Sequence, residues 1–134
     1  MILADTGYFI ALLDRKDHLH LRAQSWARAL REELCVTEWV ILETFNFFSA
    51  PVDRAKTHVL LAQIRRNPLC RIIPSSPASV EAALQLHAAR GDKEWSLTDC
   101  LSFHVMQQSG ISRALAHDHH FEQAGFEALM RREP

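Results

Sequence analysis

Met1-Ile2-Leu3-Ala4-Asp5-Thr6 is the stretch on which the fold prediction depends. This short apolar run ends on an acidic residue, and residues 7–13 follow with the apolar density of a buried helix. The pattern predicts a strand, a turn and a helix, with Asp5 at the carboxyl end of the strand. Because ligands bind at this edge of open α/β sheets, Asp5 is a candidate site residue.

Helical and strand patterns alternate along the rest of the chain. We expect helices over residues 6–14, 20–34, 38–50, 52–66, 78–89, 96–110 and 119–124. Strands are expected at residues 35–37, 69–73 and 112–116, with a possible edge strand at 126–130. Helices separate the strands and no hairpin signal joins them, so we predict an α/β fold with a mostly parallel sheet of four to five strands. One domain should span residues 1–134, because no linker or repeat interrupts it.

The composition is that of an ordinary folded protein, with 48% hydrophobic and 23% charged residues. A net charge of −1 gives no case for broad polyanion binding, although a local basic rim would be enough for a nucleic-acid enzyme. Cys35, Cys70 and Cys100 form no CxxC motif and sit among apolar residues, which indicates buried, reduced thiols. No apolar run approaches the ~18 residues of a membrane span, and the apolar opening is too short for a signal peptide. We therefore expect a cytoplasmic protein with no membrane partner.

Four acidic residues are candidate site residues, and each also has a purely structural explanation. Asp5 and Asp118 both follow strands, where an acid commonly caps the next helix. Asp99 closes Ser96-Leu97-Thr98-Asp99, which matches a capping box with Asp in place of the usual Glu. Glu43 lies in an apolar helix and could face solvent; if it were buried, it would have to be paired, protonated or bound to a metal.

The case for a site comes from all four acids together. Carboxylates converging on one sheet edge would repel one another, so they would need a compensating cation. Oxygen-only ligands favour Mg²⁺ or Mn²⁺ over zinc. Such a site can activate a water nucleophile and offset charge on a phosphoryl group.

Four segments carry a family resemblance, in the same order along the chain. They are Leu3-Ala4-Asp5-Thr6, Glu43, Trp95-Ser96-Leu97-Thr98-Asp99-Cys100 and Ala116-His117-Asp118-His119-His120-Phe121. On these segments the chain resembles PIN-domain ribonucleases of the kind found as the toxins of bacterial VapBC toxin–antitoxin pairs. The most specific pieces are residues 95–99 and Asp118-x-x-Phe121, whereas residues 51–90 match only in their helical character.

The resemblance implies a three-layer α/β/α PIN-like fold and a metal-dependent endoribonuclease that hydrolyses RNA. The catalytic residues would be Asp5, Glu43, Asp99 and Asp118, with Mg²⁺ or Mn²⁺ held by Asp5, Asp99 and Asp118. Hydroxyl groups that assist the ligands or the phosphate would be Thr6 and either Ser96 or Thr98. The chain departs from the commonest pattern at His117, where Thr or Ser is frequent. The resemblance also implies an antitoxin protein partner and a homodimer.

Candidates for substrate binding are basic or aromatic. The possible basic rim comprises Arg15, Lys16, His18, His20, Arg65, Arg66 and Lys93. Of these we expect Lys93 to contact RNA, because it lies just before the Asp99 motif. His119 and His120 could flank the site beside Asp118 and touch substrate. Trp95 is as suited to anchoring the core as to base stacking. The histidine clusters lack the spacing of a zinc site.

Three alternatives stay open. A PIN-like scaffold could bind RNA or protein without cleavage, although a complete acid set counts against it. A DNA-directed nuclease or another metal phosphoesterase could use the same acids, because nothing in the sequence identifies a reader of the 2′-hydroxyl group. A receiver-type phosphorylation switch is disfavoured, because Asp5 has no adjacent acidic partner.

Overall fold

A five-stranded sheet, parallel throughout, forms the centre of the protein, and the computed structural model describes residues 1–134. The strand order is β3-β2-β1-β4-β5, and each neighbouring pair is parallel. The strands are β1 (Ile2–Ala4), β2 (Leu34–Thr37), β3 (Cys70–Ile73), β4 (Arg113–Leu115) and β5 (Glu127–Ala128). The prediction of a parallel α/β sheet is confirmed.

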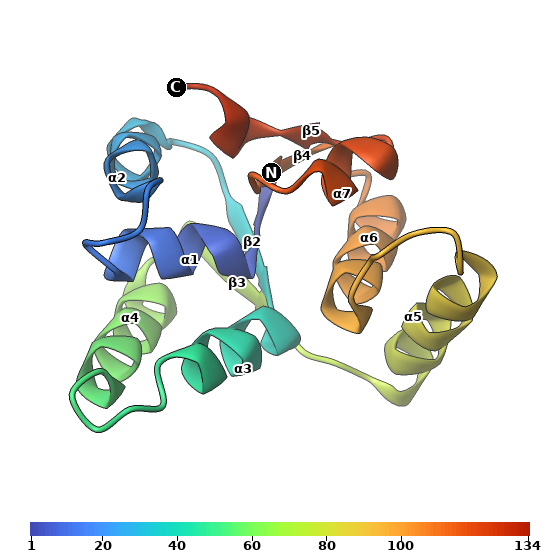
Figure 1. Ribbon diagram of the computed structural model, residues 1–134, viewed down its shortest axis with the longest axis horizontal. Coiled ribbons are helices and arrows are strands. Elements are labelled where there is room, and N and C mark those ends of the chain that lie inside the picture. Colours follow the sequence, from blue (N-terminus) through green and yellow to red (C-terminus); the bar gives the residue numbers. More distant parts are fainter.

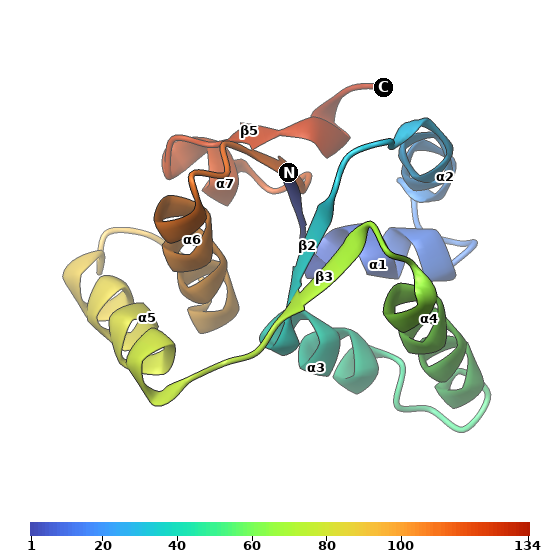
Figure 2. The same ribbon diagram turned by 180° about the vertical axis from the view of Figure 1, so that it is seen from behind.

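Helices cover both faces of this sheet and give the three predicted layers (Figures 1 and 2). The helices are α1 (Thr6–Leu13), α2 (His20–Ala29), α3 (Glu38–Phe47), α4 (Arg54–Arg66), α5 (Pro77–Ala89), α6 (Leu97–Ser109) and α7 (His119–Gln123), followed by a 3₁₀ turn, η1 (Leu129–Arg131). Helices α1, α2 and α4 lie on one face and α5 and α6 on the other (Figure 1). Helix α3 continues from β2 and contacts α1, α4 and α6. None of the helices is both long and apolar enough to span a membrane.

Successive side chains of each strand point to opposite faces of the sheet, which explains why the protein has a hydrophobic core on each face. In β1, Ile2 and Ala4 belong to the cluster beneath α1, α2 and α4, whereas Leu3 belongs to the cluster beneath α6. In β2, Leu34 faces the first cluster and Cys35 the second. Successive strand side chains point to opposite faces, so a strand covered on both faces needs apolar residues at every position. The unbroken apolar run before Asp5 satisfies this requirement.

The strand order creates a switch point beside β1. From β1 the chain runs outward to β2 and β3, then returns through α5 and α6 to place β4 on the other side of β1. Ligand sites of open α/β sheets lie at such a reversal, outside the carboxyl ends of the strands. Asp5 follows β1 and Asp118 follows β4, so the topology brings these two residues to the same crevice.

One helix prediction was wrong at its end. The helix expected over residues 20–34 stops at Ala29, and Leu30 is extended with ψ 133°. Leu34 instead begins β2, where it pairs with Ile2 and Cys70 and is 8% exposed. Leu21, expected on the apolar stripe, is 76% exposed. Burial between two strands outweighs the helical periodicity of Leu34, because tertiary packing overrides local propensity. The predicted edge strand, residues 126–130, is shortened to β5 and η1.

Candidate active site

Asp5 is the most buried of the four acids. Its backbone N–H donates to Leu115 O at 3.2 Å, which ties the end of β1 to β4. The residue is extended (φ −91°, ψ 160°) and precedes α1, but its side chain makes no capping hydrogen bond. Burial raises the pKa of Asp5 to about 7, and the carboxylates of Asp99 and Glu43 contribute to the rise. A cap alone does not account for an acid in this position.

Asp118 caps α7 and also faces the same crevice. Its Oδ1 accepts from the backbone N–H of His120 at 3.2 Å, so the capping role considered from the sequence is present. Its side chain is nevertheless 46% exposed, and on the cleft side its Oδ2 lies 3.3 Å from His120 Nδ1. Asp118 therefore both caps α7 and contributes a carboxylate to the cleft.

Asp99 is held by the capping box at the start of α6. Ser96 Oγ accepts from the Asp99 N–H at 2.9 Å, and Asp99 Oδ2 accepts from the Ser96 N–H at 3.0 Å. Burial raises the pKa of Asp99, against the lowering effect of these bonds and of His120. The capping box fixes this carboxylate in one orientation, toward the cleft.

Glu43 comes from α3, in its second turn. Its side chain is exposed rather than buried, so burial does not force it to be paired or protonated. It lies in the wall of the same cleft and is close enough to Asp5 to raise the pKa of that residue. Glu43 therefore supplies negative charge from the side of the cleft opposite α7.

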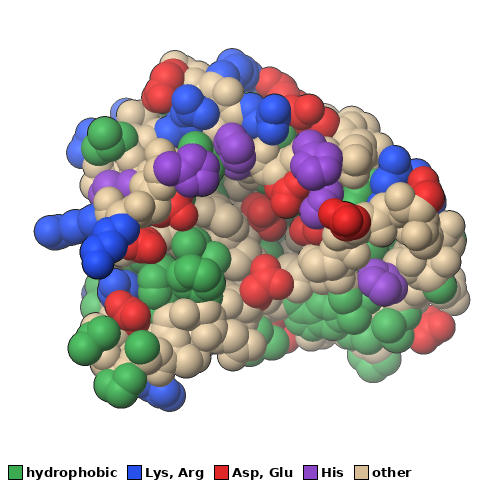
Figure 3. Space-filling model, in the orientation of Figure 1, with side chains coloured by type: hydrophobic (Ala, Val, Ile, Leu, Met, Phe, Trp, Pro, Cys, Tyr) green, Lys and Arg blue, Asp and Glu red, His purple; other side chains and the backbone are tan.

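All four acids line one open cleft of about 730 Å³. Figure 3 shows acidic and histidine side chains gathered in the middle of this face. Thr6, Ser96 and His119, expected from the sequence, also line it. His120, which the sequence placed with His119 beside Asp118, lines it as well. The lining residues not singled out as site candidates from the sequence include Asp17, Glu94 and Arg131.

His120 lies between two of the acids. Its Nδ1 is 3.1 Å from Asp99 Oδ2 and 3.3 Å from Asp118 Oδ2, and its side chain is 13% exposed. The next residue, Phe121, is fully buried against Phe103, so the start of α7 is anchored in the core. The adjacent His119 is 62% exposed, with Nδ1 3.1 Å from Asp118 Oδ1.

Part of the cleft wall carries basic and imidazole groups, from His18, His117 and Arg131. His18 and His117 meet edge to face with ring centroids 5.9 Å apart, and Arg131 Nη1 donates to His117 O at 3.1 Å. Loss of solvation lowers the pKa of His117, and the neighbouring Arg131 and His18 lower it further. Arg131 carried no sequence signal, because only the packing of η1 against the end of β4, with Met130 N–H donating to Ala116 O at 3.0 Å, brings it here.

Within the possible basic rim only His18 lines the cleft. The expected residues that do not line it are Arg15, Lys16, His20, Arg65, Arg66, Lys93, Trp95 and Thr98. Lys93 is absent from its walls and has its ammonium group 3.8 Å from Asp92, and Thr98 is likewise absent. Trp95 is 6% exposed, and its Nε1–H donates to Gln123 Oε1 at 3.0 Å. Of the two roles considered for Trp95, the structure supports the core anchor.

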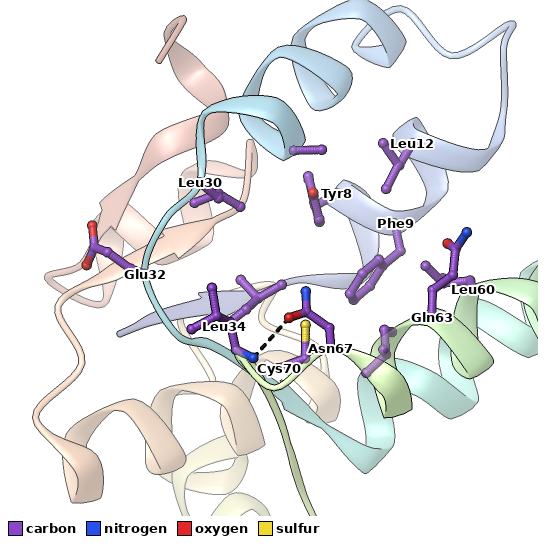
Figure 4. A pocket seen from close by; sticks show the side chains of 13 residues that line it. Tyr8, Phe9, Leu12, Leu30, Glu32, Leu34, Leu60, Gln63, Asn67 and Cys70 are labelled. Atoms are coloured by element: carbon purple, nitrogen blue, oxygen red, sulfur yellow. Dashed lines mark hydrogen bonds between the residues drawn. The ribbon is translucent and has the colours of Figure 1, made fainter.

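A separate apolar cavity of about 200 Å³ lies between α1, α2, α4 and the β2–β3 edge (Figure 4). Tyr8, Phe9 and Leu60 contribute to its walls, and Glu32 is its one carboxylate. A single acid cannot assemble a multidentate cation site. The acidic cleft is therefore the stronger candidate for chemistry.

The residues of the acidic cleft fit a divalent cation. Asp5 is a buried acid whose pKa is raised in part by neighbouring carboxylates, which is the signature of an uncompensated acid cluster. Thr6 Oγ1 is buried in the same cleft and has no hydrogen-bond partner. The group whose ligand atoms all lie within 4.8 Å of one another is Asp118, His119 and His120. Nitrogen donors therefore stand beside the carboxylates, which the sequence spacing did not predict.

Comparisons with known proteins agree with this architecture. A family model described as the PIN domain matches residues 2–127. The 23S rRNA-specific endonuclease VapC20 of Mycobacterium tuberculosis is 28% identical over 126 residues, which cover 94% of this chain and 95% of that protein. Its crystal structure, described as that of a sarcin–ricin loop-cleaving toxin, has a TM-score of 0.84 at 26% identity, covering 94% of this chain and 96% of that one. FitAcB from Neisseria gonorrhoeae shares the fold, with a TM-score of 0.67 at 23% identity over 96% of each chain.

Proposed function

Since the chain belongs to the PIN-domain family, we propose that it is an endoribonuclease that requires Mg²⁺ or Mn²⁺ and is the toxin of a toxin–antitoxin pair. The observation that carries the proposal is the convergence of Asp5, Glu43, Asp99 and Asp118 on one open cleft at the switch point of the sheet. The similarity to VapC20, an rRNA endonuclease, supports RNA as the substrate class. A toxin–antitoxin complex from Klebsiella pneumoniae has the same fold, with a TM-score of 0.61 at 16% identity over 84% of this chain and 83% of that one.

Each acid has a role that follows from its position. Asp5, Asp99 and Asp118 would hold the cation, which when bound would lower the pKa of water and offset charge on the phosphate. Glu43, on the exposed side of the cleft, orients or deprotonates the attacking water. Ser96 keeps Asp99 in place through the capping box, and the unpaired Thr6 hydroxyl is free to bond a water or a phosphate oxygen.

The wall formed by His18, His117 and Arg131 contacts the RNA backbone. The rest of the cleft is acidic and repels phosphate, so the polyanion needs donors on one side to approach the acids. Arg131 supplies a guanidinium group there, whose Nε also pairs with Glu122 Oε1 at 2.9 Å. The exposed rings of His18 and His117 supply further N–H donors. His119 extends these contacts on the other side of Asp118.

An antitoxin protein would regulate this activity by covering the cleft. Because the cleft is open and Glu43 and Asp118 are exposed, nothing within the chain shields RNA from it. A homodimer is also part of the proposal. Exposed apolar side chains on and after α3, including Leu42, Phe47 and Val52, offer surface for such protein contacts.

The test is cleavage of defined RNAs by the purified protein. A sarcin–ricin loop hairpin, an unrelated hairpin and a DNA version of the first would be incubated with Mg²⁺, Mn²⁺ or EDTA. We expect RNA cleavage that requires the metal ion and falls at least ~100-fold in Asp5→Asn and Asp99→Asn, because each removes a charged ligand.

Circular dichroism would show that both variants keep the wild-type fold. Full activity in EDTA, or in either variant, would contradict the mechanism. Cleavage of the DNA alone would favour the DNA nuclease, and specific RNA binding without cleavage would favour the scaffold.

A further inference from the structure

His120 lies between Asp99 and Asp118, two of the acids that would hold a cation. Its Nδ1 approaches one oxygen of each carboxylate, at 3.1 and 3.3 Å. The imidazole is mostly buried, and Phe121 and the α7 cap restrict its backbone. The contact therefore joins the carboxylates of two separate elements, α6 and α7, through one nitrogen.

These separations match those of ligands on a common metal ion. Adjacent ligand atoms are about 3.0 Å apart in an octahedron with bonds of ~2.1 Å, and about 3.3 Å apart in a tetrahedron with bonds of ~2.0 Å. Taken singly, each distance from Nδ1 therefore fits two ligands of one ion. The group whose ligand atoms all lie within 4.8 Å of one another is Asp118, His119 and His120. Asp99 lies outside that group, so its side chain would have to move closer to Asp118 for both carboxylates to share the ion with His120.

The hydroxyl group of Thr6 is a second feature of the cleft that bears on metal binding. Thr6 Oγ1 is buried, lines the cleft and has no hydrogen-bond partner. Buried hydroxyl groups are almost always paired, so the Thr6 hydroxyl next to Asp5 is available to a ligand bound in the cleft. A hydrated cation held between the acids supplies such a partner through its water molecules.

We propose that His120 is a direct nitrogen ligand of the metal ion, which gives the site a mixed carboxylate and imidazole donor set. This proposal rests on the cation site of the proposed function. Carboxylate donors suit Mg²⁺, whereas imidazole shifts preference toward first-row transition ions. The centre therefore selects Mn²⁺ over Mg²⁺, and His120 is the residue that sets this selectivity.

The competing role for His120 is indirect. Its Nδ1–H could donate to both carboxylates and orient them while only oxygen atoms touch the ion. Loss of His120 would weaken metal binding in either case, so affinity alone does not separate the two roles. The coordinating atom must be observed.

Pulsed electron paramagnetic resonance of Mn²⁺ bound to the full chain observes it directly. We expect a hyperfine coupling from a directly bound ¹⁴N in the wild type, its loss in His120→Ala and its persistence in the neighbouring His119→Ala. Titration calorimetry should show Mn²⁺ affinity falling about tenfold or more in His120→Ala, with a smaller loss for Mg²⁺.

Several outcomes would overturn the proposal: no bound nitrogen in the wild type, persistence of the coupling in His120→Ala, or its loss in His119→Ala alone. If His120→Ala does not fold, His120→Gln replaces it, and the wild-type spectrum remains decisive. The measurement uses no RNA. A wild-type protein that binds Mn²⁺ through nitrogen but cleaves nothing would contradict the proposed function and leave this inference standing.

Discussion

At the scale of single residues, burial of Asp5 is the feature with the clearest energetic consequence. The unfolded chain loses this proton near pH 4, whereas the folded protein keeps it until about pH 7. Between these values the folded state binds more protons, so the free energy of unfolding falls as pH rises. The site therefore lowers the stability of the metal-free protein, as is common for functional sites.

Asp5→Asn should reverse this loss. In EDTA the two proteins should have the same free energy of unfolding near pH 4. From there to about pH 7 the variant should become increasingly more stable than the wild type, and above pH 7 the difference should stay constant. The change in the Asp5 pKa from 3.8 to about 7 sets an upper limit of roughly 4 kcal/mol. Urea denaturation at several pH values measures the difference. Equal stability of the two proteins at pH 8 would show that Asp5 is not held in a charge-disfavouring environment.

Arg131 should act on RNA binding rather than on the chemical step. Arg131→Gln removes one cation from the cleft wall, so KM should rise several-fold while kcat changes little. The dependence of log binding affinity on log salt concentration should become shallower by about 0.7 to 1. Filter binding and cleavage kinetics across salt concentrations measure both effects. Arg28→Gln, on the exposed surface of α2 and outside the cleft, is the matched control and should leave both unchanged.

At the scale of secondary-structure elements, two capping boxes allow the effect of a helix cap on stability to be distinguished from its effect on activity. Ser96 begins α6 beside the cleft, and Ser76 begins α5 away from it, with Ser76 Oγ accepting from the Ser79 N–H at 3.1 Å. Both helices have 13 residues and the same kind of cap. Only the α6 cap holds a proposed ligand.

Ser96→Ala and Ser76→Ala should each lower the free energy of unfolding by about 1 kcal/mol. Ser96→Ala should also reduce cleavage and Mn²⁺ affinity, because Asp99 is then less constrained. Ser76→Ala should keep full activity at temperatures where it is folded. Thermal unfolding combined with cleavage assays tests the pair. Equal activity loss in both variants would assign the effect to general destabilisation.

At the scale of the whole molecule, the sheet order concentrates negative charge at one place. Chain segments far apart in sequence deliver Asp5, Asp99 and Asp118 to the same crevice, so folding itself brings the carboxylates together. A cation that binds only the folded state then stabilises the entire domain.

Mn²⁺ should therefore raise the melting temperature of the wild type by several degrees. At a concentration 100 times the dissociation constant, the gain is about 2.7 kcal/mol. Asp99→Asn should show little of this increase, and EDTA should reverse it. Differential scanning calorimetry provides the measurement. The same increase in wild type and Asp99→Asn would mean that the ion binds elsewhere.

The sequence by itself determined the parallel α/β fold, most element positions and the acids that line the cleft. These features depend on local information: apolar runs for strands buried on both faces, helical periodicity, and acids at the ends of strands and starts of helices. The resemblance to PIN-domain ribonucleases added the grouping of Asp5, Glu43, Asp99 and Asp118. The four residues do line one cleft, and their catalytic roles stay a prediction.

Only the tertiary structure decided which other side chains share that cleft. Leu34 joined β2 because pairing with two strands outweighed its helical pattern, and Trp95 was assigned to the core by its burial. His120 reached its place between the acids through the packing of α7 against β5 and α6, and Arg131 reached the cleft through the packing of η1 against β4. Lys93 lies outside the walls of the cleft. Contacts between segments distant in the chain depend on how whole elements pack. The nitrogen donor between Asp99 and Asp118 therefore became visible only in the folded protein.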